Sequence, residues 1–154
     1  MSQPVANPYL EQEVLSASPA KLRWLLIDKS IKLSQVVGEL WRTGDVAWAD
    51  QWSLRLREIL NELLGGIHGQ DAVAKRVSDL YVFKIQLLTE AELTRDIAKL
   101  GQLRDLLEID AETWRQLQQK LAQAPPSAHA APPPPLGGLW SSPIGNETSL
   151  CVDA

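Results

Sequence analysis

The sequence predicts an all-α protein, an antiparallel up-down four-helix bundle with a disordered Pro-rich C-terminal tail. None of its ten prolines lies between residues 20 and 124. Because proline inside a helix costs about 3 kcal/mol, this whole stretch can be helical. Apolar residues recur there three and four positions apart, as on the buried side of a helix. The breaks between the repeating segments are short, which predicts that consecutive helices run antiparallel.

The first predicted helix runs from Pro19 to about Thr43. Ser18 can cap its first turn, and proline is favoured at the first helical position. Gly44 can adopt the left-handed conformation that ends a helix. The core positions predicted for this helix are Leu22, Leu25, Leu26, Leu33, Val36, Val37 and Leu40.

Two more helices follow. Asp45 is the expected N-cap of the second helix, which Gly65 and Gly66 end, and Asp71 is the expected start of the third. The core positions predicted for the second helix are Ala49, Trp52, Leu56, Ile59, Leu60 and Leu63. Those predicted for the third are Val73, Val77, Leu80, Leu87, Leu88 and Ala91.

The fourth predicted helix begins between residues 94 and 96 and repeats apolar residues at heptad spacing. Asp110 interrupts this repeat. Burying a carboxylate without a partner costs several kcal/mol, so either the helix turns slightly there or Asp110 finds a hydrogen-bond donor. The repeat consists of Leu100, Leu103, Leu107, Trp114, Leu117 and Leu121.

Three parts are expected along the chain. Residues 1–17 form an N-terminal extended segment, residues 18–124 the four-helix bundle and residues 125–154 the tail. The tail holds most of the prolines, including a run of four at 132–135, and has no lysine or arginine. This composition favours extended, solvated chain over a packed core.

Composition argues against several kinds of partner. The 15 basic and 19 acidic residues leave a net charge of −4, which is unlike the basic patch of a nucleic-acid-binding protein. The prolines near the uncharged stretch 121–146 interrupt any membrane-spanning helix, so no membrane insertion is expected. The N-terminus lacks the pattern of a secretory signal, and Cys151 is the single cysteine. We therefore expect a cytoplasmic protein.

The sequence shows no recognisable catalytic, cofactor or metal site. Its two histidines, His68 and His129, lack the spacing to carboxylates that metal sites in helical bundles have. The glutamates on the predicted helices alternate with arginines at the spacing of surface ion pairs. We therefore expect a protein that is not an enzyme and uses no cofactor.

The predicted helices carry more apolar residues than one bundle core needs. On the first helix the extra residues form a second stripe nearly opposite the core stripe. Such residues can complete a wide core, form a homodimer contact or line exposed grooves for the amphipathic helix of a partner. They are Trp24, Ile27 and Ile31 on the first helix, Trp48 and Leu54 on the second, and Val82, Phe83 and Ile85 on the third.

The N-terminal residues form a recognisable pattern. Tyr9, in the triplet of residues 7–9, is followed by Val14, by Ser-Ala-Ser-Pro at 16–19 and by a leucine-rich helix with Leu-Ile-Asp at 26–28. This order resembles the FliS family of flagellin export chaperones, in which a tyrosine precedes a Val-x-Thr-Ala-Ser/Thr-Pro box. Agreement continues at Leu-Tyr 80–81, at Ala91 and at Trp114, so the resemblance covers residues 7–120.

Three residues depart from the family pattern. Ile27 stands where the family often has tyrosine, Glu92 where asparagine is common, and Asp110 where an apolar residue is expected. These differences affect the register of the last helix and the details of partner contacts.

The resemblance implies a cytoplasmic export chaperone that binds the C-terminal helical segment of flagellin. Such a chaperone prevents premature polymerisation and assists delivery to the flagellar type III export apparatus and its gate. We expect a monomer when free and a one-to-one complex with the client, and the Tyr9 segment to cover part of the groove when no client is bound. The expected client-binding residues are Tyr9, Leu10, Val14, Trp24, Ile27, Ile31, Trp48, Val82 and Ile85.

The residues also leave a second function open. A structural or regulatory bundle could self-associate through the same surplus stripe and use the Pro-rich tail as a protein-interaction segment. A stable homodimer that ignores flagellin favours this alternative, whereas a monomer that forms a one-to-one complex favours the chaperone.

Overall fold

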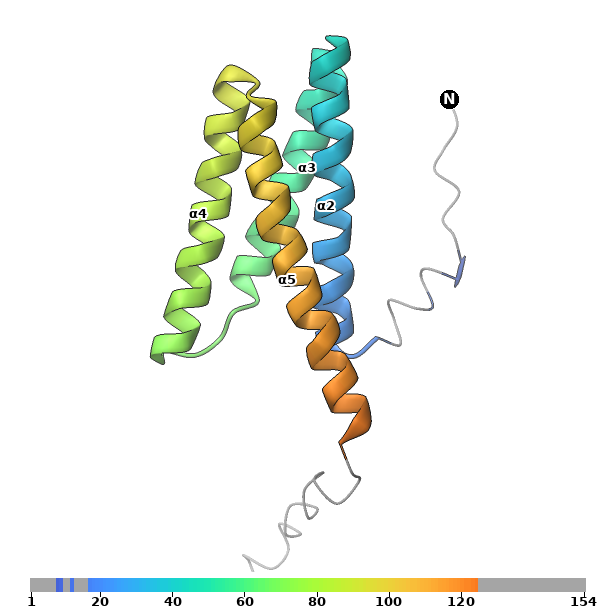
Figure 1. Ribbon diagram of the computed structural model, residues 1–154, viewed down its shortest axis with the longest axis vertical. Helices are drawn as coiled ribbons and strands as arrows, with labels where there is room; N and C mark the ends of the chain where they lie inside the picture. The colour runs from blue at the N-terminus through green and yellow to red at the C-terminus, as the bar shows by residue number, and fades with distance from the viewer. Residues whose placement is uncertain (1–7, 10–11, 13–16, 125–154) are drawn as a thin grey trace, which may run out of the picture. The chain divides into compact units, whose positions relative to one another are not determined.

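The structure, a computed structural model, describes residues 8–9, 12 and 17–124. Between residues 17 and 124, four helices follow one another, namely α2 (Pro19–Thr43), α3 (Val46–Gly65), α4 (Ala72–Thr94) and α5 (Ile97–Gln123). Each helix runs antiparallel to the one before it (Figure 1). No strand occurs in the described ranges, and the predicted all-α up-down bundle is confirmed. The expectation of a disordered tail concerns residues outside those ranges.

Local chemistry accounts for where the helices begin and end. The Ser18 hydroxyl accepts a hydrogen bond from the backbone N–H of Lys21, and Gly44 ends α2 with φ at 82°. The Asp71 carboxylate accepts from the N–H of Ala74 and so caps α4. Asp45 is the N-cap of α3, but its side chain makes no capping hydrogen bond. The predicted boundaries of α2 and α3 and the predicted start of α4 are therefore confirmed, although Asp45 makes no side-chain capping contact. The last helix, α5, begins at Ile97, one residue after the predicted interval.

Two glycines allow a direct test of this account of the helix ends. Gly44→Ala should lower the free energy of unfolding by about 1 kcal/mol, because a side chain at its positive φ is strained. Gly101→Ala should raise that free energy by about 0.5–1 kcal/mol, because Gly101 is helical and an added Cβ meets nothing within 4 Å. Urea denaturation of both variants measures the two changes, and effects of the same sign would contradict this explanation.

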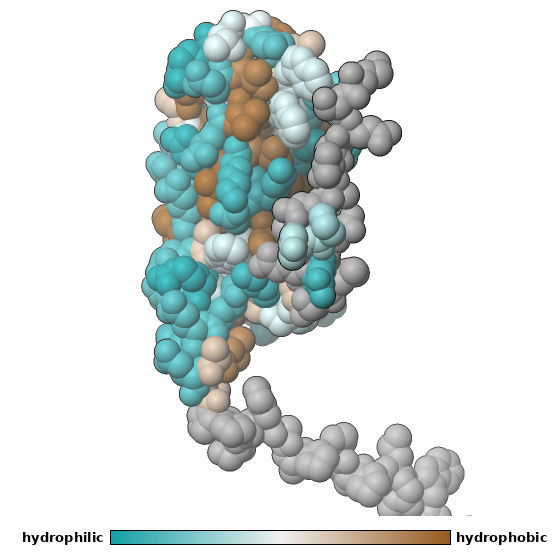
Figure 2. Space-filling model, turned by 90° about the vertical axis from the view of Figure 1, so that its right-hand side faces the viewer, coloured by the Kyte–Doolittle hydropathy of each residue, from teal (hydrophilic) through white to brown (hydrophobic). Residues whose placement is uncertain are grey.

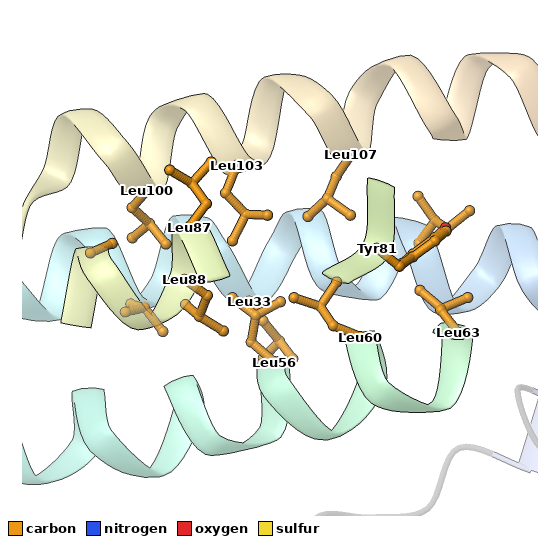
Figure 3. Close-up of a cluster of buried hydrophobic side chains, with 13 residues drawn as sticks. Leu33, Leu56, Leu60, Leu63, Tyr81, Leu87, Leu88, Leu100, Leu103 and Leu107 are labelled. Carbon is orange, nitrogen blue, oxygen red and sulfur yellow. The ribbon is translucent and has the colours of Figure 1, made fainter. Parts of the chain in front are cut away.

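All four helices contribute to one apolar core. Figure 3 shows leucines from each helix pointing toward one another, with Tyr81 at one end of the cluster. Most of the predicted core positions on α3 and α5 are buried. The fully buried apolar residues include Val37, Ala49, Leu56, Leu60, Leu88, Ala91, Leu103 and Leu107.

Some predicted core positions are exposed instead. On α5, Leu117 and Leu121 are exposed because this helix extends past the ends of α2 and α4, where no neighbour covers it (Figure 1). Leu80 is exposed on α4, on a side of the helix away from buried Tyr81. Leu22 and Val36 on α2 and Val73 on α4 are exposed as well.

The buried side of α2 is centred on residues that the apolar pattern passes over. Ser30 and Ser34 are buried together with Ile27, Leu33 and Val37. The two serine hydroxyls donate hydrogen bonds to carbonyl oxygens of the preceding turn, at 2.9 and 2.7 Å, so their burial leaves no hydroxyl donor unsatisfied. The prediction that Ile27 belongs to a surplus stripe opposite the core is therefore wrong.

Two polar contacts join neighbouring helices inside the bundle. Glu92 on α4 accepts hydrogen bonds from Ser53 and Arg57 of α3. Lys84 on α4, almost fully buried, donates to the Asp110 carboxylate of α5. Of the two possibilities open for Asp110, the structure therefore shows the second, in which the carboxylate finds a donor.

Candidate functional site

A groove of about 700 Å³ opens at the end of the bundle where α2 begins, α3 ends and α4 begins. Most of its wall is apolar, as in sites that accept apolar side chains. Two of its large apolar residues lie open to solvent, with 37% of Leu22 and 69% of Val73 exposed. The apolar wall consists of Pro19, Ala20, Leu22, Leu26, Leu63, Ile67, Val73, Ala74, Val77 and Trp114.

The longest connection in the bundle explains why this end is open. Residues 66–71 join α3 to α4, whereas only residues 44–45 and 95–96 make the other two connections. In Figure 1 the last turn of α3 and the first turn of α4 lie apart at this link. Gly69, at φ 110°, gives the link a conformation that other residues rarely adopt. Side chains of the first turns therefore face a groove instead of a neighbouring helix.

Arg23 brings a positive charge to the groove. Its guanidinium carbon lies 5.2 Å from the centroid of the Tyr81 ring and 5.3 Å from that of the Trp114 ring. Both distances suit cation–π attraction, so two aromatic rings from α4 and α5 hold this side chain in place.

Tyr81 connects the groove with the buried ion pair behind it. Burial raises the pKa of its hydroxyl far above the ordinary tyrosine value, and the nearby Asp110 carboxylate adds to this effect while Arg23 opposes it. The ammonium nitrogen of Lys84 lies 4.3 Å from the centroid of the same ring. The hydroxyl therefore stays protonated at neutral pH and can serve only as a neutral hydrogen-bonding group.

The remaining polar residues of the groove do not form a metal site. Glu62, His68 and Asp71 lie on its wall, and the Asp71 carboxylate already caps α4. Within the described ranges, no three His, Cys, Asp or Glu side chains are placed to hold a metal ion. No helix in the same ranges has the length and hydropathy needed to cross a membrane.

The residues expected to bind a client are scattered over the bundle. Tyr9, Trp48 and Val82 are exposed, and Trp24 is half-buried. The structure corrects the expectation for Ile27, which has no exposed surface, because α2 turns this residue toward the other helices. Ile31 and Ile85 are half-buried and pack against the core, while Leu10 and Val14 lie outside the described residues.

None of the expected residues that the structure describes lines the groove. Sequence reasoning placed Leu22, Leu26, Val73 and Val77 in the core instead. One signal could have found them, since Leu22 and Leu26 lie near the start of α2, and Val73 and Val77 lie near the start of α4, which follows the Gly-containing link 66–71.

The rest of the surface offers a less concentrated apolar area. Figure 2 shows the face of the molecule that lies on the right-hand side of Figure 1. Hydrophobic residues gather in the upper half of this face, with hydrophilic residues among them, and its lower half is mostly hydrophilic. Isolated exposed apolar side chains are common in soluble proteins and need no partner. The groove, where apolar walls from several helices converge, is therefore the candidate binding site.

Most of the chain is similar to known proteins. The family model described as flagellar protein FliS matches residues 1–121. The flagellar secretion chaperone FliS of Salmonella typhimurium (strain LT2) is 30% identical over 118 residues, which cover 75% of this chain and 87% of that protein.

Proposed function

Because the chain belongs to the FliS family, we propose that it is a flagellar export chaperone that binds the C-terminal helical segment of flagellin in the cytoplasm. Binding keeps flagellin from polymerising too early and assists its delivery to the type III export apparatus. The observation that carries this proposal is the open apolar groove at one end of a bundle whose core is otherwise complete.

The energetics of such a groove suit a chaperone. A segment that is disordered alone loses conformational entropy when it folds on a partner, at a cost of about 2–5 kcal/mol or more. Each large apolar side chain that it buries contributes about 1.5–3 kcal/mol. A few anchors in the groove therefore offset the ordering cost without making release impossible, and the proposed activity needs no catalytic group.

We assign the main client contacts to the groove residues Leu22, Leu26, Val73 and Val77, whose side chains line its wall. The exposed residues Trp48 and Val82 and the half-buried Trp24, Ile31 and Ile85 remain expected contacts for the rest of the client. The segment with Tyr9, Leu10 and Val14 is expected to cover part of the surface before a client arrives. These assignments are predictions from the family pattern and the exposed apolar area.

Titration of the purified chain with the C-terminal flagellin segment from the same cell tests the proposal. We expect saturable one-to-one binding in isothermal titration calorimetry with a negative heat-capacity change, because apolar surface is buried. The same segment with its order of residues scrambled is the control and should not bind. Absence of binding by the native segment would contradict the proposal.

The size of the free chain distinguishes the alternative function. Self-association through exposed apolar residues such as Phe83 and Leu54 would give a stable homodimer that flagellin does not alter. A chaperone of the proposed kind is monomeric and gains the mass of one client. Light scattering coupled to size-exclusion chromatography measures both cases.

A further inference from the structure

We propose that Arg23 makes the groove selective for a client helix that presents one Asp or Glu side chain between apolar residues. The inference rests on the proposed function, because it concerns the same groove and names the chemistry of the segment that the groove accepts. The inference is based on the buried Nε–H of Arg23, which has no acceptor and lies between apolar walls of the groove.

Arg23 lies on the groove wall, and no carboxylate in the described part of the chain neutralises it. Lys84 pairs with Asp110, whereas Arg23 forms no ion pair with any residue that the structure describes. Its Nε–H is buried and finds no acceptor. Glu62 also lines the groove but makes no ion pair with Arg23 within the described ranges.

A second buried donor lies beside Arg23. Tyr81 is 2% exposed, and both the Arg23 guanidinium and the Asp110 carboxylate lie near its hydroxyl. The buried Nε–H of Arg23 still lacks an acceptor, and an unsatisfied buried donor is unfavourable, so an incoming anionic oxygen is favoured at this point. The apolar wall excludes water from the new contact and strengthens it further.

Two aromatic rings fix the position of the Arg23 guanidinium before a ligand binds. Its stacking on Tyr81 and Trp114 limits the positions that Arg23 can take, so little side-chain entropy is lost on binding. The planar guanidinium also matches a carboxylate by paired N–H donors, which an ammonium group cannot do.

The walls favour a side-chain carboxylate over a terminal one. Leu22 and Leu26 lie on either side of Arg23 along α2, and Val73 and Val77 form the facing wall on α4. A client that covers both walls must continue past Arg23 in both directions, with apolar residues one turn before and after the acid. A C-terminal carboxylate ends the chain and would leave one half of the groove uncovered.

The test compares Arg23→Met with the unaltered chain against a series of flagellin C-terminal peptides. In the series each Asp or Glu is changed singly to Asn or Gln, and one further peptide carries an amidated C-terminus. We expect Arg23→Met to weaken binding of the native peptide about 30-fold or more. One acid substitution should weaken binding to the unaltered chain to a similar degree and have little further effect on Arg23→Met.

The possible results separate this inference from the proposed function. If the native peptide binds but every acid substitution acts independently of Arg23→Met, the inference fails and the proposed function stands. If only amidation couples to Arg23, the side-chain assignment is wrong. If the native peptide does not bind the unaltered chain, both fail. If circular dichroism shows that Arg23→Met folds poorly, the binding of the peptide series to the unaltered chain decides the question. Weaker binding on substitution of one particular acid supports the inference, and unchanged binding for every substituted peptide overturns it.

Discussion

Asp110→Leu should lower the free energy of unfolding by about 3–5 kcal/mol. The substitution removes the carboxylate that neutralises Lys84, whose side chain is only 3% exposed. Lys84 must then stay charged in an apolar interior without a partner or pull the helices apart to reach water. Urea denaturation followed by circular dichroism measures the loss.

The double variant Lys84→Met, Asp110→Leu is the control. It replaces the ion pair between α4 and α5 by apolar side chains, so most or all of the lost stability should return. A double variant as unstable as Asp110→Leu would mean that the shape of the site, and not the unpaired charge, causes the loss. A single variant as stable as the unaltered chain would show that Lys84 does not depend on Asp110.

The double variant Leu22→Gln, Val73→Gln should weaken binding of the flagellin segment on the order of 100-fold, because it removes two apolar anchors from the groove. Both residues are open to solvent in the free chain, so the free energy of unfolding should change little. Calorimetric titration gives the affinity, and thermal unfolding gives the stability.

Val36→Gln, Leu93→Gln is the matched control for the groove variant. Val36 on α2 is 41% exposed and Leu93 on α4 is 79% exposed, and neither lines the groove. The control makes a similar chemical change on the same two helices and should leave the affinity for the client unchanged. Equal losses in the two double variants would place the client surface elsewhere on the bundle.

Helix boundaries proved predictable because the groups that decide them are close in sequence. Ser18 with Pro19, Gly44 and Asp71 act on backbone groups within a few residues, and each lies where its chemistry predicts. The same locality explains the one incomplete case, since Asp45 has the right position but a backbone conformation in which its carboxylate makes no capping bond.

The buried side of each helix was harder to predict, because polar residues can be buried once they are satisfied. Ser30 and Ser34 donate to their own helix, and Lys84 donates to Asp110 on another. A pattern of apolar residues omits all three. The buried side predicted for α2 was therefore rotated from the observed one, and Ile27 was predicted on the side opposite the core. A buried lysine needs a partner from a different helix, which no local pattern reveals.

The candidate site was also predictable only in part from the sequence. The surplus of apolar residues was evident from the sequence, and so was the family resemblance at Tyr9, Leu80, Tyr81 and Trp114. The members of the groove were not evident, because Leu22 and Val73 follow the same helical period as residues of the core. Their exposure depends on how the starts of α2 and α4 and the end of α3 are arranged around the groove.

Local chemistry along the chain thus determines four helices, their order and their ends, since capping and periodicity act over a few residues. Assembly of the four helices decides which apolar residues are covered, where Lys84 and Arg23 find or lack a carboxylate, and where a groove remains open. The reason is that burial and charge pairing join residues far apart in the sequence, and only the packed bundle brings these residues together.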